Sequence, residues 1–252
     1  LDGTGTPLNF DTDISGSART LPWTIGAYVG ISAPVVHTLK SDGDYTLMSA
    51  WEAGEQRDLV ALNESESLEC YNDFGGPLVD SEVVVTGWTT SGTSLIRIRA
   101  AAGQGHEGVV GAGFTLEGSA ANRGAIALLQ DYCIVNGITV NNTNSSGWGI
   151  DVNGASYCYT INCISTSANY NFASRNGIGN PGIYWINCLA LDTRSRAFSV
   201  DDGNTIINCG AMRGVLGFRA NSGDVFIYNS ATYGTDLAFG TSNSFRGSHN
   251  AT

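Results

Sequence analysis

The sequence predicts an all-β solenoid, a coil of short strands that stack on one another, and three observations predict it. One phrase centred on an asparagine recurs at spacings of 26, 25, 21 and 21 residues, a period typical of stacked repeats. A second apolar segment recurs between these phrases, separated from them by Asn, Gly, Asp and Ser, which favour turns. No helix-length 3.6-residue pattern interrupts the repeats. The repeated asparagines are Asn136, Asn162, Asn187, Asn208 and Asn229.

The asparagines are expected at one corner of the coil. Parallel strands lie ~4.8 Å apart, so equivalent amides in successive coils come within hydrogen-bonding distance of one another. Asparagine also tolerates the left-handed backbone angles of a tight corner. We therefore predict a ladder of hydrogen-bonded side-chain amides running along the coil.

The phrases Ile161-Asn162-Cys163-Ile164 and Ile186-Asn187-Cys188-Leu189 resemble a corner phrase of the right-handed parallel β-helix repeat proteins, the pectin-lyase-like superfamily. The resemblance covers about residues 35–252. It implies a right-handed, single-stranded parallel β-helix whose regular coils span about residues 126–252. Lyases, hydrolases, adhesins and inert fibres share this architecture, so the resemblance alone implies no single function.

A short helix is expected before the regular coils. The segment from Asp42 to Ala53 predicts a turn followed by an amphipathic capping helix over about residues 45–54, with Asp44 as its N-cap. The helix is expected to cover the first coil, whose open edge would otherwise pair with foreign strands.

Residues 1–34 are expected to form an N-terminal extension. The segments Asp13–Arg19 and Trp23–Tyr28 resemble the closing segment of secreted β-helix proteins, and an ordinary strand pair is the alternative. No capping helix or closing phrase is evident near Thr252. A solenoid needs a cap at each end, so this pattern predicts head-to-tail self-association into a fibre or larger assembly. The alternative is that the natural chain continues beyond Thr252.

Composition restricts the partners. The net charge of −11 argues against nucleic-acid binding, which needs a basic surface, and no apolar run is long enough for a membrane span. Three of the six cysteines repeat at one site of successive coils, which predicts buried free thiols. A disulfide between Cys133 and Cys158 is the alternative. The cysteine and histidine spacings predict no metal or cofactor, and nothing supports a calcium site.

Two functional hypotheses follow. The first is an extracellular, cell-surface or virion structural subunit; the second is a tailspike-like protein that binds or degrades a polysaccharide as a lyase or hydrolase. Degradation requires carboxylates for acid–base chemistry. Turn chemistry alone also selects Asp and Asn at such corners. The catalytic candidates are Asp192, Arg194, Arg196, Asp201 and Asp202.

Aromatic side chains in or beside the loops are candidates for stacking on sugar rings, with packing in the core as the alternative. These are Trp148, Tyr170, Tyr184 and Trp185. Four Asn-x-Ser/Thr acceptor sequences in expected turns or termini are candidates for glycosylation. These are Asn63, Asn141, Asn144 and Asn250.

Overall fold

The structure is a computed structural model that describes residues 34–166, 168–175, 182–241 and 245–248. The chain divides into two units, Leu1–Gly30 and Ile31–Thr252. The predicted N-terminal extension lies outside the described residues, so its resemblance to a closing segment stays a prediction.

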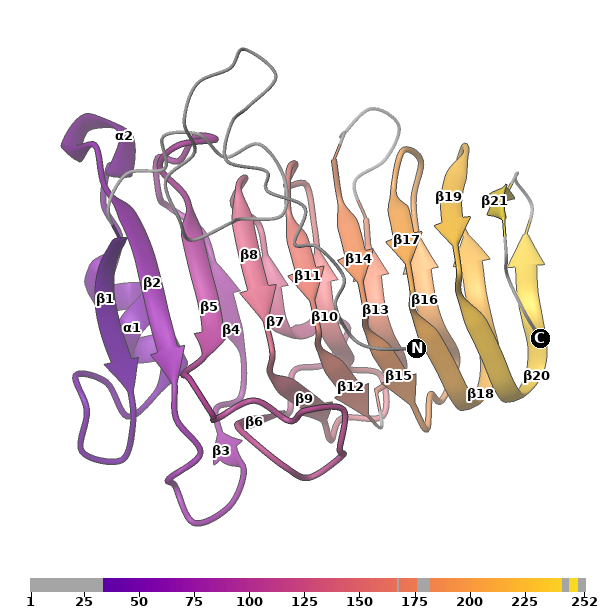
Figure 1. Ribbon diagram of the computed structural model, residues 1–252, viewed down its shortest axis with the longest axis horizontal. Helices are drawn as coiled ribbons and strands as arrows, with labels where there is room; N and C mark the ends of the chain where they lie inside the picture. The colour runs from indigo at the N-terminus through magenta and orange to yellow at the C-terminus, as the bar shows by residue number, and fades with distance from the viewer. Residues whose placement is uncertain (1–33, 167, 176–181, 242–244, 249–252) are drawn as a thin grey trace, which may run out of the picture. The chain divides into compact units, whose positions relative to one another are not determined.

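The second unit is a right-handed parallel β-helix, as predicted. Every strand pair is parallel, and each strand bonds to the equivalent strand of the coil before and after it, so the strands form three faces (Figure 1). Face A consists of β1 (Pro34–Leu39), β2 (Ser65–Cys70), β5 (Ile96–Ala100), β8 (Cys133–Asn136), β11 (Tyr159–Ile161), β14 (Tyr184–Ile186), β17 (Thr205–Ile207), β19 (Val225–Tyr228) and β21 (Phe245–Ser248).

Faces B and C form one continuous sheet because β18 and β20 turn the corner without a break. Face B consists of β3 (Leu78–Val79), β6 (Thr115–Gly118), β9 (Thr139–Asn142), β12 (Ile164–Thr166), β15 (Leu189–Leu191) and the first halves of β18 (Gly210–Ala220) and β20 (Ala231–Thr241). Face C consists of β4 (Val83–Val85), β7 (Gly124–Leu128), β10 (Trp148–Val152), β13 (Tyr170–Ser174), β16 (Arg196–Val200) and the second halves of β18 and β20.

The core is built from columns of equivalent side chains. Phe172, Phe198 and Phe218 occupy one register position of face C and are fully buried. Their rings stack with centroids 4.9 and 5.0 Å apart, which matches the spacing of neighbouring strands. The strands alternate inward and outward side chains, so each coil buries its apolar side on the next.

The amide hydrogen bonds of the predicted asparagine ladder join Asn136, Asn162 and Asn187 at the corner between faces A and B. Asn162, Asn187, Asn208 and Asn229 have φ between 47° and 52°, the left-handed region that Asn tolerates. The Nδ2 of Asn187 donates to Asn162 Oδ1 at 3.1 Å, and the Nδ2 of Asn162 donates to Asn136 Oδ1 at 3.3 Å.

All six cysteines are free and buried, so the structure contains buried thiols rather than the alternative disulfide. The Sγ atoms of Cys188 and Cys209 each donate to the carbonyl of a residue in the preceding coil, at 3.3 Å. Burial raises the pKa of the Cys163 thiol well above its usual value. These cysteines act as small core residues and have no access to solvent for reaction.

The predicted capping helix is α1 (Met48–Glu55), followed by the short α2 (Leu59–Leu62). Met48 and Trp51 are fully buried. The prediction that Asp44 caps the helix is wrong, since the N-cap is Leu47. The Asp44 carboxylate instead accepts hydrogen bonds from the amide and hydroxyl of Thr38, at 2.8 and 2.9 Å.

A buried carboxylate, Glu66, joins the cap to face A. Its Oε1 accepts from Trp51 Nε1 at 3.0 Å and contacts His37 Nδ1 at 2.8 Å, and its Oε2 accepts from Arg57 at 2.7 Å. Arg57 also pairs with Glu55 at 3.0 Å. One ring nitrogen of His37 and one carboxylate oxygen each of Glu55 and Glu66, atoms of the kind that bind metal ions, lie within 4.8 Å of one another. The Arg57 guanidinium bridges both carboxylates, so the cluster ties helix α1 to face A.

We predict that Asn162→Ala destabilises the β-helix by about 1 to 2 kcal/mol, because alanine loses both ladder hydrogen bonds and is strained at positive φ. Asn162→Gly, which lacks the amide but accepts the backbone angle, should cost less. Urea unfolding of the three proteins measures the difference. Equal stabilities of the alanine variant and the parent would contradict the role of the ladder.

We predict that Glu66→Ala lowers the free energy of unfolding by about 2 to 4 kcal/mol, since it leaves the buried Trp51 indole without its acceptor and removes one of the carboxylates that pair with Arg57. The matched control is Glu69→Ala, which breaks a more exposed pair with Arg99 and should cost about 1 kcal/mol or less. The free energies of unfolding are measured by thermal or urea unfolding. Similar decreases for the two variants would show that Glu66 stabilises the cap no more than an exposed ion pair does.

Candidate functional site

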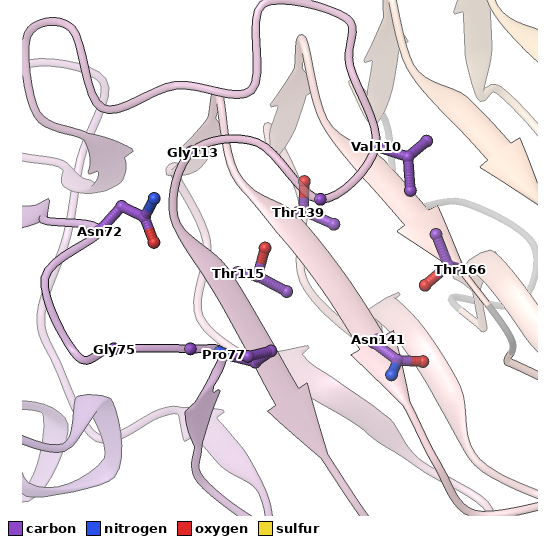
Figure 2. Close-up of a pocket in the computed structure, with 11 residues that line it drawn as sticks. Asn72, Gly75, Pro77, Val110, Gly113, Thr115, Thr139, Asn141 and Thr166 are labelled. Carbon is purple, nitrogen blue, oxygen red and sulfur yellow. The ribbon is translucent and has the colours of Figure 1, made fainter.

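A cleft of about 450 Å³ lies on the outer side of face B (Figure 2). Two loops form its walls: residues 71–77, which connect β2 to β3, and residues 101–114, which connect β5 to β6. Strands β6, β9 and β12 form its floor. The lining residues include Asn72, Gly75, Pro77, Val110, Gly113, Thr115, Thr139, Asn141 and Thr166.

The register of the floor strands determines which side chains face the cleft. Leu116 and Val140 pair with each other and are fully buried in the core, so the alternating neighbours Thr115, Thr139 and Asn141 point outward. Figure 2 shows these three on the two neighbouring strands. Equivalent positions on adjacent strands lie ~4.8 Å apart, so the floor presents evenly spaced polar groups.

Two oxygen atoms of the floor are buried and have no hydrogen-bond partner among the described residues: the Oγ1 of Thr139 and the Oδ1 of Asn141. Thr139 is 3% exposed. The Nδ2 of Asn141 donates to Glu117 Oε2 at 3.4 Å, which orients the free oxygen of the amide. A buried polar atom without a partner costs about 1 to 3 kcal/mol, so a ligand that supplies hydrogen-bond donors here recovers free energy.

The two walls support each other. The amide N–H of Asn72 donates to Gln104 Oε1 at 3.1 Å, and the rings of Phe74 and Phe114 meet edge to face at 6.5 Å. The loops are therefore held in place before any ligand arrives, which reduces the ordering cost of binding.

His106 attaches the second wall to the asparagine corner. Its ring is 7% exposed, its Nδ1 accepts from the amide of Gly108 at 2.9 Å, and its Nε2 lies 2.6 Å from the carbonyl oxygen of Asn162. Because Nδ1 is an acceptor, these contacts assign the proton to Nε2, which donates to the carbonyl. One side chain thus couples the loop to the ladder two coils further along.

The chemistry of the cleft is that of hydroxyls, amides and backbone. None of the described residues that line it carries an ionisable side chain, and Glu117 lies beside it, bonded to Asn141. General acid–base cleavage of a glycosidic bond needs a pair of carboxyl groups. The arrangement is therefore suited to holding an uncharged polar ligand.

The predicted catalytic carboxylates do not converge. Asp192 lies at the corner before β16 and pairs with Arg213 at 2.9 Å, whereas Asp201 and Asp202 lie at the corner after it. The five-residue strand β16 separates the corners by about 16 Å, which exceeds the roughly 5 to 10 Å between catalytic carboxyl groups of glycosidases. Asp202 Oδ1 accepts the amide of Asp224 at 2.7 Å, so it serves the turn, as the alternative interpretation expects.

The remaining predicted residues separate into different environments. Arg194 donates to the carbonyl of Asn144 at 2.9 Å. Trp148 and Tyr170 lie side by side on face C, with ring centroids 5.1 Å apart, and the Arg196 guanidinium lies 4.8 Å from the Tyr170 ring. The structure thus brings two of the four aromatic candidates together, with Arg175 over the Trp148 ring and Arg196 over the Tyr170 ring, and Trp148 is only 7% exposed.

The other two aromatic candidates lie elsewhere. Tyr184 is on face A, stacked on Tyr159 with centroids 4.9 Å apart. Trp185 is fully buried in the core, so the prediction that it contacts a carbohydrate is wrong. The reason is the alternation of the strand, which turns Trp185 inward where Tyr184 faces outward.

The predicted glycosylation sites differ in access. Asn63 is exposed at the end of α2 with a φ of 53°. Asn141 belongs to the cleft floor, and Asn144 holds a turn by accepting the amide and hydroxyl of Ser146 at 3.0 Å. Asn250 lies outside the described residues. Glycosylation itself stays a prediction.

The sequence reasoning missed the threonines of the floor and the loops around them. Thr115 precedes Leu116 and Thr139 precedes Val140, so each alternates with an apolar residue, and glycine-rich segments flank Thr115. Outward polar residues next to irregular loops were the available signal. The two threonines are aligned by the register between β6 and β9, which cannot be deduced from the sequence.

No protein-family model matches the sequence, and no curated protein matches it. Among solved structures, the deglycosylated form of the pectin methylesterase from Aspergillus niger is similar, with 11% identity, a TM-score of 0.46, and coverage of 89% of this chain and 87% of that chain. The penultimately deglycosylated form of that enzyme gives 10% identity, a TM-score of 0.44 and the same coverage. At these values the likeness assigns no activity, and the parallel strand pairing itself defines the fold.

We predict that His106→Ala loosens the second wall without unfolding the β-helix. Hydrogen exchange at the Gly108 amide should then accelerate roughly tenfold, because that amide loses its acceptor and the loop loses its attachment to Asn162. Val109→Ala, an exposed change in the same loop, is the control and should leave exchange unaltered. Unchanged Gly108 exchange in the histidine variant would contradict this role.

Proposed function

We propose that this protein is an extracellular β-helix protein that binds a polysaccharide in the cleft on face B. The observation that carries the proposal is the pair of buried, unpartnered oxygens of Thr139 and Asn141 in the floor of an open cleft. A saccharide chain supplies hydroxyl donors at regular intervals along its length. Such donors satisfy buried acceptors that would otherwise cost free energy.

The form of the cleft supports binding of an extended chain. Its floor crosses three successive parallel strands, on which Glu117, Asn141 and Thr166 occupy one row of polar positions. Its glycine-rich walls let a ligand approach the backbone closely. Because the described lining residues include no carboxyl pair, we propose recognition rather than cleavage as its activity.

The structural-subunit hypothesis rests on different observations. Helix α1 buries Met48 and Trp51 at the N-terminal end of the coil, which favours a closed end there over direct continuation into another coil. Head-to-tail self-association into a fibre stays a prediction. The absence of nucleic-acid partners and the extracellular, cell-surface or virion location also stay predictions. Among the described residues, no helix is long and apolar enough to cross a membrane.

We predict that Thr139→Val weakens polysaccharide binding about threefold to tenfold, the contribution of one hydrogen bond, while leaving the protein as stable as the parent or more so. The stability gain is expected because valine removes an unsatisfied hydroxyl from a buried position without changing the shape of the side chain. The measurement is binding to a panel of neutral and acidic polysaccharides, followed by titration of the best ligand.

The matched control is Thr205→Val, which makes the same change at an outward position of face A. It should bind like the parent. A panel without any binding, or equal affinities for the Thr139 variant and the parent, would overturn the proposal.

A further inference from the structure

Face C carries two arginines that lack acidic partners in a chain with a net charge of −11. The described residues place most other arginine side chains against carboxylates. The paired arginines are Arg57, Arg99, Arg123, Arg175, Arg213 and Arg246. No ion pair within the described part of the chain joins Arg196 or Arg219 to a carboxylate. In an acidic protein, acidic partners are abundant, so two unpaired arginines side by side require an explanation.

The register of β16 and β18 brings the two side chains together. Ser199 and Arg219 are paired across these strands, and Arg196 reaches along β16 to donate to Ser199 Oγ at 3.3 Å. Ser199 is 2% exposed and donates onward to Asn221 Oδ1 at 3.2 Å. Arg196 therefore bonds to the residue that pairs directly with Arg219 on the next strand, and Asn221 holds that buried hydroxyl in place.

The electrostatics at this position are unfavourable in the absence of an anion. Burial lowers the pKa of Arg196, the proximity of Arg219 lowers it further, and Tyr170 opposes both effects. Neighbouring charges of the same sign disfavour each other's charged form. An anion placed between the two guanidinium groups removes this repulsion and gains charge-assisted hydrogen bonds.

The adjacent coil shows the contrasting, internally satisfied arrangement. Arg175 lies 3.7 Å from the Trp148 ring centroid and donates to Asp151 Oδ2 at 2.8 Å. Asp151 is buried, and burial raises its pKa although Arg175 acts in the opposite direction. Here the protein supplies its own carboxylate to the arginine. One coil further on, Arg196 lies over the Tyr170 ring in the same way, but no carboxylate pairs with it among the described residues.

We propose that Arg196 and Arg219 form a binding site for the anionic group of an acidic saccharide, a sulfate ester or a carboxylate. Arginine forks match the planar or tetrahedral oxygens of such groups. The site lies on face C, whereas the cleft lies on face B, so this inference does not depend on the proposed function of the cleft.

The test compares dextran with dextran sulfate, which share a backbone, and adds alginate as a carboxylated polymer, all at one low salt concentration. The parent should bind dextran sulfate or alginate at least tenfold more tightly than dextran, and added salt should weaken this binding. Arg219→Gln and Arg196→Gln should each reduce that preference about tenfold. Preference for the sulfated or the carboxylated polymer identifies which anionic group the site recognises.

Arg213→Gln is the control, because it removes the same charge from an exposed arginine that already pairs with Asp192. It should retain the preference. Urea unfolding verifies that each variant is folded. The inference is overturned if the parent binds the charged polymers no better than dextran, or if Arg213→Gln weakens binding as much as Arg219→Gln does.

Discussion

The stacking of equivalent residues at the spacing of parallel strands is the constraint on which the rest of this structure depends. Each coil repeats the backbone path of the coil before it, so every side chain has a counterpart one strand away. At the corner between faces A and B, the counterparts are asparagines that adopt left-handed angles and join their amides. In the core the equivalent residues are phenylalanines and free cysteines, and each packs against the same residue type in the next coil.

The same constraint places the candidate sites. Outward residues on neighbouring strands form rows because the core fixes the register. On face B the rows hold threonine and asparagine beneath two braced loops, and on face C one row holds Asp151, Ser199 and Arg219. The loop of residues 101–114 between β5 and β6 is long, and the cleft lies beside it. This agrees with the general location of binding residues on loops carried by a rigid scaffold.

The catalytic candidates show the limits of reading motifs along the chain. Asp192, Asp201 and Asp202 are close in sequence, but one strand of the solenoid separates the two corners. A β-strand extends over its full length, so ten residues can place two carboxylates far apart, whereas residues 24 positions apart, such as Thr115 and Thr139, become neighbours. Proximity in a solenoid follows the repeat and not the sequence distance.

The sequence by itself determined the parallel β-helix, the asparagine corner, the buried thiols and the capping helix, because each arises from local chemistry repeated at a fixed period. It also indicated which aromatic residues were candidates, but not which of them faced outward. Tertiary structure decided that Trp185 belongs to the core, that Trp148 and Tyr170 share a face with Arg196, and that Thr139 lies in the floor of a cleft. The physical reason is register: a shift of one residue reverses the direction of every side chain in a strand, and only the stacked coils fix that register.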